Sequence, residues 1–404
     1  MTETDNISFK AFLIAISFWL IFITIEGSFS VQILTPILLL LLLYDIVLKK
    51  NSCFKISKSG KILGLFVLLL GLTSVINSMF FVDVMSIDSI IGILYFIVIF
   101  LWYVFTTNQE YNAKEIKMMV NSYIYMSLIC SLFIIYRYLG GQIGKIAMVN
   151  LINVEIDENY VSALIAAATL FLFNILINRK QKLKGKLLNL LILTINLFAI
   201  ALSGSRAALI STAIAAIISL FVSLVRNFSY KKIMLVLFAM FSFIILGSMV
   251  LRKIPAWTFD RYFNSNYADN SNNTRLLLWE NGINGILNRP FTGYGITVFD
   301  KLKDYGNVHG IQIPERVPAH QTFLDIGIYC GIGGILLFIY FLYTIFIPFI
   351  KKKNIIYLPV IVIVFFIMNI LGAERSVFLW NNLVLLSIIN HYLQHNNHQA
   401  QDII

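Results

Sequence analysis

Apolar runs of nearly twenty residues, separated by short polar segments, make up most of the chain from Phe9 to Leu393. A helix needs about 20 apolar residues to cross the roughly 30 Å hydrocarbon core of a bilayer. Runs of this kind recur about twelve times, so the pattern predicts an all-α integral membrane protein with about twelve transmembrane helices. The expected spans are Phe9–Ile25, Val31–Leu48, Ile62–Phe81, Ile87–Phe105, Met118–Tyr138, Tyr160–Ile177, Leu187–Leu202, Ala207–Val225, Ile233–Leu251, Phe323–Ile350, Ile355–Leu371 and Val377–Leu393.

Basic residues are distributed unequally between the two sets of short segments that connect these spans. If the N-terminus is cytoplasmic, 19 Lys and Arg residues fall on the cytoplasmic side and four fall in the opposite short loops. Short cytoplasmic loops carry an excess of Lys and Arg. The asymmetry therefore predicts that both termini are cytoplasmic.

One polar segment, residues 252–322, interrupts the pattern between the ninth and tenth spans. The assigned orientation makes it a large extracytoplasmic loop, and we expect it to carry short amphipathic helices. No other segment suggests an appended soluble domain, so residues 1–404 are interpreted as a single polytopic membrane domain. A membrane protein with one large water-facing loop usually performs its chemistry there.

The composition supports this interpretation and narrows the choice of partners. The chain is 59% hydrophobic and 13% charged, with a mean hydropathy of +0.82, values far from those of soluble globular proteins. The net charge of +11 arises mostly at the expected cytoplasmic lipid surface, where anionic headgroups attract Lys and Arg. We therefore expect contacts with membrane lipids and no nucleic acid partner.

Arg206 lies in the sequence Leu202-Ser-Gly-Ser-Arg-Ala-Ala208, which predicts a very tight outer turn between two spans. An arginine in this position can simply extend its charge to the lipid headgroups. Alternatively, its planar guanidinium and the two serine hydroxyls can bind the oxygens of a lipid-linked phosphate. The sequence alone leaves both interpretations open.

The long loop contains a segment in which apolar residues recur at helical spacing from Leu276 to Leu287. This spacing predicts a short amphipathic helix on the membrane surface, capped by Asn273 or Thr274 and ended by Pro290. Arg275 is then expected in the first turn, where free N–H groups favour an anion, although capping and anchoring explain the pattern without a ligand. After the helix, Gly293-Tyr294-Gly295 predicts a flexible turn and lacks the lysine and spacing of a phosphate loop.

His320 lies in the segment Pro314–Asp325, which leads into the tenth span. A histidine at an interface often serves as a hydrogen-bonding anchor, but its imidazole can also accept a proton from a sugar hydroxyl. The other histidines with suggestive spacing, His391, His395 and His398, fall in the expected cytoplasmic tail. We assign no metal site to them.

Four short motifs resemble the O-antigen ligase and polysaccharide polymerase superfamily of multi-span bacterial enzymes. They are Ser203-Gly-Ser-Arg-Ala-Ala208; Arg275-x-x-x-Trp279 followed by Asn288-Arg-Pro-Phe-Thr-Gly-Tyr-Gly295; Ala319-His-Gln-Thr-Phe-Leu324; and Asp157-Glu-Asn-Tyr160. Together they cover the chain from about Asp157 onwards. Glu158 replaces a proline of the family pattern, Gln321 stands where Asn is usual, and Asp325 lies near a common Glu, so the group that orients His320 stays open.

The resemblance implies a metal-independent glycosyltransferase that uses a glycan on undecaprenyl pyrophosphate at the outer face of the bacterial cytoplasmic membrane, with no cofactor. It implies that Arg206 and Arg275 bind the pyrophosphate and that His320 activates or positions the acceptor hydroxyl. It further implies a glycan acceptor, and a chain-length regulator and a flippase as protein partners. The expected additional substrate-binding residues are Asn159, Tyr160, Trp279, Tyr294, Arg316 and Arg375.

Three functions are compatible with this description. The first is a repeat-unit polymerase, such as a capsule or O-antigen polymerase, which transfers glycan to the terminal hydroxyl of another lipid-linked repeat unit. The second is an O-antigen ligase, which transfers finished glycan to lipid A core or another acceptor. The third is a transporter of lipid-linked oligosaccharides, which the single oversized loop and the absence of a visible internal repeat make the least favoured.

Overall fold

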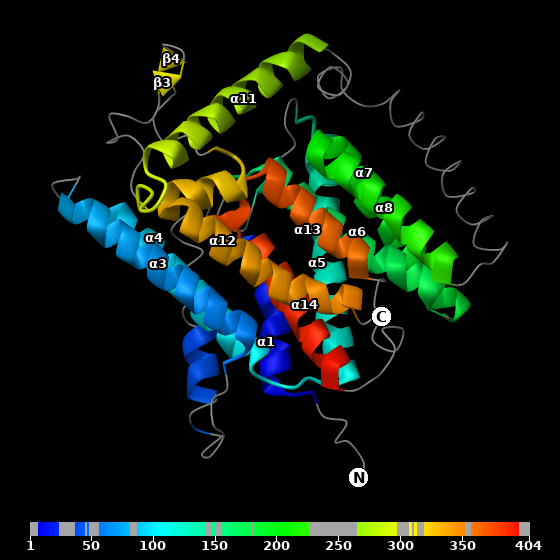
Figure 1. Ribbon diagram of the computed structural model, residues 1–404. Coiled ribbons are helices and arrows are strands. Elements are labelled where there is room, and N and C mark those ends of the chain that lie inside the picture. Colours follow the sequence, from blue (N-terminus) through cyan, green and yellow to red (C-terminus); the bar gives the residue numbers. More distant parts are fainter. Residues whose placement is uncertain are drawn as a thin grey trace. The chain divides into compact units, whose positions relative to one another are not determined.

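A computed structural model describes residues 7–23, 37–44, 47, 56–80, 87–142, 148–149, 155–179, 181–226, 265–296, 307–308, 311–312, 319–351 and 357–395. These residues are helical apart from turns, short connections and two strand pairs of two residues each (Figure 1). The helices are α1 (Phe9–Ser17), η1 (Phe18–Ile23), α3 (Lys58–Phe80), α4 (Ile87–Thr107), α5 (Ala113–Leu139), α6 (Glu158–Asn178), α7 (Leu183–Ser203), α8 (Arg206–Arg226), α11 (Ser265–Asn288), α12 (Thr322–Lys351), α13 (Leu358–Ile370), η4 (Ala373–Arg375) and α14 (Val377–His395).

The strand pairs are antiparallel. Strand β1 (Met148–Val149) pairs with β2 (Glu155–Ile156) just before α6, and β3 (Asn307–Val308) pairs with β4 (Ile311–Gln312) between α11 and α12.

Seven of the described helices, α3 to α8 and α12, are long and apolar enough to cross a membrane. They coincide with seven of the expected spans and confirm the all-α membrane class. Helices α1 and α13 are apolar but shorter, and α14 is not among the seven. The expected span Ile233–Leu251 lies outside the described residues, and the total of twelve spans and their orientation stay predictions.

The chain forms two compact units, which are described separately. The first comprises Met1–Ile116, Ser271–Pro348 and Met368–Asn396, and the second comprises Lys117–Asn270, Phe349–Ile367 and Asn397–Ile404. The long polar loop is thus divided between them, with the described part of α11 from Ser271 onwards in the first unit.

The core of the first unit is a cluster of aromatic rings from four helices. Phe66 of α3, Phe96 of α4, Phe338 of α12 and Trp380 of α14 contact one another with ring centroids 5.7–6.5 Å apart. Aromatic pairs in such tilted or edge-on arrangements contribute about 0.5–1.5 kcal/mol each beyond the area that they bury. The cluster therefore holds α3, α4, α12 and α14 together.

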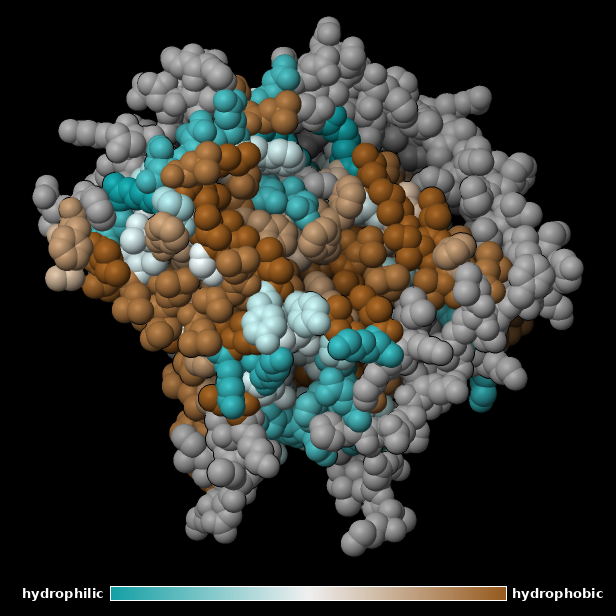
Figure 2. Space-filling model, viewed as in Figure 1, coloured by the Kyte–Doolittle hydropathy of each residue, from teal (hydrophilic) through white to brown (hydrophobic). Residues whose placement is uncertain are grey.

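Helices α3 and α4 lie side by side (Figure 1), and Gly64 of α3 makes room for the ring of Phe100 of α4. Leu65, Leu68 and Leu72 of α3 are exposed. Hydrophobic side chains cover the visible surface over α3 and α4 and over α7 and α8, whereas hydrophilic residues gather on α11 (Figure 2). Helices that are apolar on both the packed and the exposed face are typical of proteins whose solvent is lipid.

Helix α6 is the centre of the second unit. In the most apolar 18-residue stretch of α6, 83% is buried. The corresponding values are 28% for α7 and 33% for α8, both of which pack against α6. Helices α6 and α8 are parallel and in register, because Asn159, Asn174 and Asn178 accept hydrogen bonds from Ser205, Ser219 and Ser223 at a nearly constant sequence offset. Interhelical hydrogen bonds of this kind stabilise helix association where no water competes.

Candidate functional site

His320, the predicted proton acceptor, has an unusual backbone. Its φ of 53° is the only positive φ of a non-glycine residue within the described part of the chain. The left-handed conformation costs roughly 1–2 kcal/mol for an L-residue with a side chain, and such conformations persist where the surroundings impose them, often at functional sites. The surrounding structure therefore holds the backbone turn that carries the imidazole.

Hydrogen bonds hold the residues on both sides of His320. The Ala319 N–H donates to Asp325 Oδ1 at 2.8 Å. Gln321 precedes the first residue of α12, and its Oε1 accepts from the Leu324 N–H at 2.6 Å, which satisfies a free donor of the first helical turn. The sequence left open which of Asp325 and Gln321 orients the histidine, and these two bonds fix the residues on either side of it.

The first turn of α12 is also attached to the segment that connects α13 to η4. The Thr322 hydroxyl donates to the Leu371 carbonyl at 2.9 Å and accepts from the Ala373 N–H at 2.9 Å. Gln321 Nε2 donates to Asn369 Oδ1 at 3.2 Å. Elements far apart in the sequence thus meet beside His320.

Two buried carboxyl groups, those of Asp325 and Glu374, lie near the same glycine in this connection. A Cβ at Gly372 would lie 2.7 Å from Asp325 Oδ2 and 3.6 Å from Glu374 Oε2. The Glu374 carboxyl accepts from the Tyr329 hydroxyl at 3.2 Å, and its carbonyl accepts from Trp380 Nε1 at 2.7 Å. Glu374 was not among the predicted site residues, although an acidic residue between two apolar runs was a visible signal.

Helix α12 is broken at Gly331, where φ is 66° and ψ is −164°. A side chain there would collide with the Pro290 carbonyl, which would lie 2.3 Å from its Cβ. The Ile332 N–H donates to that carbonyl at 2.8 Å. The absence of a side chain at Gly331 therefore lets the loop around Pro290 pack against the interrupted helix.

The loop that fills the break is Arg289–Ile296, which we call the strap. The strap N–H groups of Tyr294 and Gly295 donate to the carbonyls of Ile328 and Tyr329 at 2.7 and 2.9 Å. Those carbonyls are left without helical partners by the break, so the strap completes their hydrogen bonding. The turn that the sequence predicted to be flexible is thus fixed to α12 by backbone bonds on both sides of Gly331.

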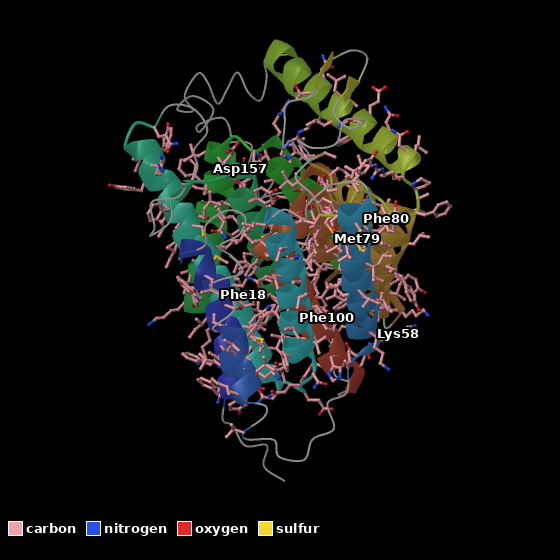
Figure 3. The ribbon with its side chains drawn as sticks, turned by 90° about the vertical axis from the view of Figure 1, so that its left-hand side faces the viewer. Phe18, Lys58, Met79, Phe80, Phe100 and Asp157 are labelled. Carbon is pink, nitrogen blue, oxygen red and sulfur yellow. The ribbon has the colours of Figure 1, made fainter. Side chains whose placement is uncertain are left out.

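The strap is also attached to the end of α3 that carries Met79 and Phe80, the end opposite Lys58 (Figure 3). Arg289 Nη1 donates to Asn77 Oδ1 at 2.8 Å, and its guanidinium lies 4.5 Å from the centroid of the Tyr294 ring. Tyr294, a predicted substrate-binding residue, is only 1% exposed. Its ring therefore supports Arg289 within the strap, a contact that the sequence did not indicate.

Helix α11 begins at Ser265, and the prediction that Asn273 or Thr274 caps it is wrong. The apolar spacing that starts at Leu276 marked only the packed part of the helix, whereas its first turns are polar. Arg275 consequently lies in the middle of α11 and not beside the free N–H groups of a helix start. The predicted end before Pro290 is confirmed, because the helix stops at Asn288.

One face of α11 joins Arg275 to the His320 turn. Arg275, Trp279, Gly282 and Ile286 follow one another at intervals of four, three and four residues, which places them on the same side of the helix. A Cβ at Gly282 would lie 3.4 Å from that of Ala319, and Ile286 packs against Gly327. Arg275 therefore lies two helical turns before Gly282, which contacts Ala319, the residue that precedes His320.

The second unit brings together two other predicted motifs, those around Asn159 and Arg206. Helix α7 ends at Ser203, Gly204 has a φ of 75°, and α8 starts at Arg206, as the tight turn predicted. Ser205 Oγ donates to Asn159 Oδ1 at 2.9 Å and receives the Ala208 N–H at 3.4 Å. The starts of α6 and α8 thus lie together, with Arg206 half-buried at the first position of α8.

The remaining predicted residues are less fully placed. Tyr160 lies half-buried in the first turn of α6, and Arg375 is the last residue of η4. Arg316 lies outside the described residues, as does His398. His391 and His395 belong to the last turns of α14. Among the residues that the structure describes, no group of three or more His, Cys, Asp or Glu side chains could hold a metal ion.

Comparison with known families identifies the region that carries most of these features. Residues 188–339 match the family model described as O-antigen ligase. The match includes Arg206, α11, the strap and His320, and it ends within α12. No match was found among curated proteins.

Proposed function

We propose that this chain is a polysaccharide repeat-unit polymerase, a proposal supported by the match of residues 188–339 to the family model described as O-antigen ligase. It transfers glycan from undecaprenyl pyrophosphate to the terminal hydroxyl of another lipid-linked repeat unit at the outer face of the bacterial cytoplasmic membrane. The seven long apolar helices support an enzyme whose substrates are lipids.

The main observation that supports the proposal is the packing of the His320 turn against α11. The left-handed turn of His320 is held at Ala319, and Ala319 packs against Gly282 on the face of α11 that also bears Arg275. A proton acceptor and a guanidinium are thus supported by elements in direct contact. Glycosyl transfer from a diphosphate ester needs both groups, one for the nucleophile and one for the leaving group.

In the proposed reaction, the acceptor hydroxyl oxygen attacks the anomeric carbon of the donor glycan. The bond between that carbon and the pyrophosphate oxygen breaks, and the bonding electrons leave with the pyrophosphate. His320 takes the hydroxyl proton, while Arg275 and Arg206 bind the oxygens that gain negative charge. Asn159, Tyr160, Trp279, Arg316 and Arg375 are proposed to contact the substrates, whereas the buried Tyr294 supports Arg289.

The ligase is the second candidate, because the family match at residues 188–339 is equally compatible with it. A ligase uses the same donor and the same leaving group, so His320, Arg275 and Arg206 would have the same roles. The two functions differ only in the acceptor, which is a second lipid-linked repeat unit for the polymerase and lipid A core or another molecule for the ligase.

Reconstitution with defined substrates separates the two candidates. The purified protein is given lipid-pyrophosphate-linked repeat units alone, and the products are separated on a gel. The polymerase proposal expects a ladder of glycans without any further addition. If transfer begins only after a core acceptor is added, the protein is a ligase, and if neither mixture reacts, the glycosyltransferase proposal is wrong.

We expect the same reaction to proceed in the presence of EDTA. In the proposed mechanism, guanidinium groups stabilise the departing pyrophosphate. Many other glycosyltransferases use a divalent metal ion for this purpose. The initial rate with EDTA should match the rate without it. Strong inhibition by EDTA that added Mg²⁺ or Mn²⁺ reverses would overturn the metal-independent mechanism.

A further inference from the structure

Asp325 holds both neighbours of His320. Its Oδ1 accepts the Ala319 N–H at 2.8 Å, and its own backbone N–H donates to the Gln321 carbonyl at 2.9 Å. The two bonds bracket the single left-handed residue between them. The carboxyl bond crosses the turn, because it joins the first turn of α12 to a residue that precedes the helix.

The environment of Asp325 allows little adjustment. The residue is 0% exposed, and its Oδ2 faces Gly372, where even a methyl group would come within 2.7 Å of this oxygen. Ala319 is equally buried and packs against Gly282 of α11. A buried carboxyl that meets backbone on one side and accepts an N–H on the other has a fixed orientation, and it transmits that orientation to the turn.

We propose that Asp325 is the positioning residue of the reaction, which sets the direction of the His320 imidazole through the Ala319 backbone. This inference rests on the role of His320 in the proposed function. Asp325 contacts no substrate in this account. Its contribution is to keep His320 in the left-handed conformation from which the imidazole is presented to the acceptor.

Glu374 provides a matched control within the same unit. It is also a buried carboxyl, 2% exposed, and it also lies beside Gly372. Its carboxyl accepts from the Tyr329 hydroxyl, whereas the carboxyl of Asp325 accepts from the Ala319 N–H. Removal of either carboxyl disturbs the same packed region, but only the removal of Asp325 releases Ala319.

The first test compares Asp325→Ala, Asp325→Asn and Glu374→Ala in the reconstituted transfer reaction. Asp325→Ala is expected to lower kcat by about 10- to 100-fold, the loss that corresponds to a buried N–H left without its acceptor, with KM for the lipid-linked donor nearly unchanged. Asp325→Asn should recover most of kcat, because its amide oxygen can still accept the Ala319 N–H. Glu374→Ala should leave kcat within about threefold, since the bond between Ala319 and Asp325 is retained.

The second test uses Gly372. Gly372→Ala introduces a methyl group next to Asp325 Oδ2 and should displace the carboxyl, so it is expected to lower kcat in the same way as Asp325→Ala. In the double variant the second substitution should add almost nothing, because the carboxyl that it displaces is already absent. Full additivity of the two losses in kcat would contradict a path through Asp325.

A readout that does not need turnover separates this inference from the proposed function. The rate at which diethyl pyrocarbonate modifies His320, followed by mass spectrometry, reports how the imidazole is held. We expect this rate to change severalfold in Asp325→Ala and to stay at the wild-type value in Asp325→Asn and Glu374→Ala. Equal rates in all four proteins would overturn the positioning role, whereas a changed rate without any glycan transfer by the wild type would overturn the proposed function alone.

Discussion

Replacement of His320 by alanine is expected to abolish synthesis of long glycans while the protein still inserts into the membrane. The imidazole is the proposed acceptor of the proton from the attacking hydroxyl, and loss of a positioned general base lowers rates by about 10²- to 10⁴-fold. The hydrogen bonds that hold the turn come from Ala319, Gln321 and Thr322, and all of them remain in this variant. The measurement is the initial rate of transfer by the purified variant.

Two further variants show whether the imidazole itself is responsible. Glycine adopts a positive φ more readily than any other residue. The His320→Gly variant should therefore fold at least as well as His320→Ala and be equally inactive. His391→Ala changes a histidine in the last turns of α14, outside the proposed site, and should retain wild-type activity. Full-length polymer from His320→Ala would refute the catalytic role of this histidine.

Replacement of Arg275 by lysine is expected to reduce transfer by about 10²- to 10³-fold, as observed when one donor to a developing oxyanion is removed. Lysine keeps the charge but offers a compact ammonium, which cannot reproduce two parallel hydrogen bonds to a phosphate. Because α11 places Arg275 in mid-helix and lysine is also a good helix former, the helix itself should be unaffected. The steady-state rate with lipid-pyrophosphate-linked repeat units provides the comparison.

Arg289→Lys is the contrasting substitution in the same unit. The Arg289 guanidinium bonds Asn77 and covers the Tyr294 ring, so its loss should loosen the strap and lower the thermal unfolding midpoint of the solubilised protein. Arg275→Lys should instead leave that midpoint at the wild-type value. Wild-type turnover by Arg275→Lys would show that this arginine has only a structural role.

The features that the sequence predicted correctly depend on local chemistry. Membrane spans follow from the length and apolarity of a single segment, and seven described helices agree with the expected ones. The turn before Arg206 was predictable because Gly204 can adopt a positive φ and Ser205 can cap the next helix. The end of α11 was signalled by Pro290, which cannot continue a helix.

The features that the sequence did not reveal depend on contacts between distant segments. The polar start of α11 carries no apolar periodicity. The sequence therefore placed the start of this helix more than two turns too late. The break at Gly331 is stable only because the strap supplies hydrogen bonds from residues about forty positions earlier in the chain. Within an apolar run, nothing local distinguishes such a glycine from one that merely permits helix packing.

The candidate site was predicted in the same uneven manner. Its chemical groups, Arg206, Arg275 and His320, stand out as polar residues next to apolar spans. The residues that hold His320 in place do so through the backbone, and a hydrogen bond from Ala319 to Asp325 has no signature in the sequence. Gly372 lies beside the Asp325 carboxyl only because the connection after α13 meets the start of α12.

In the proposed mechanism, the guanidinium groups of Arg206 and Arg275 bind the lipid diphosphate, and His320 serves only the transfer step. Native mass spectrometry of the purified protein with undecaprenyl pyrophosphate and with undecaprenyl monophosphate separates these two roles. The wild type and His320→Ala are expected to bind the pyrophosphate equally well and in preference to the monophosphate, whereas Arg275→Lys and Arg206→Lys bind it weakly. The account is contradicted if the wild type shows no preference for the pyrophosphate, or if His320→Ala loses the lipid as completely as the arginine variants do.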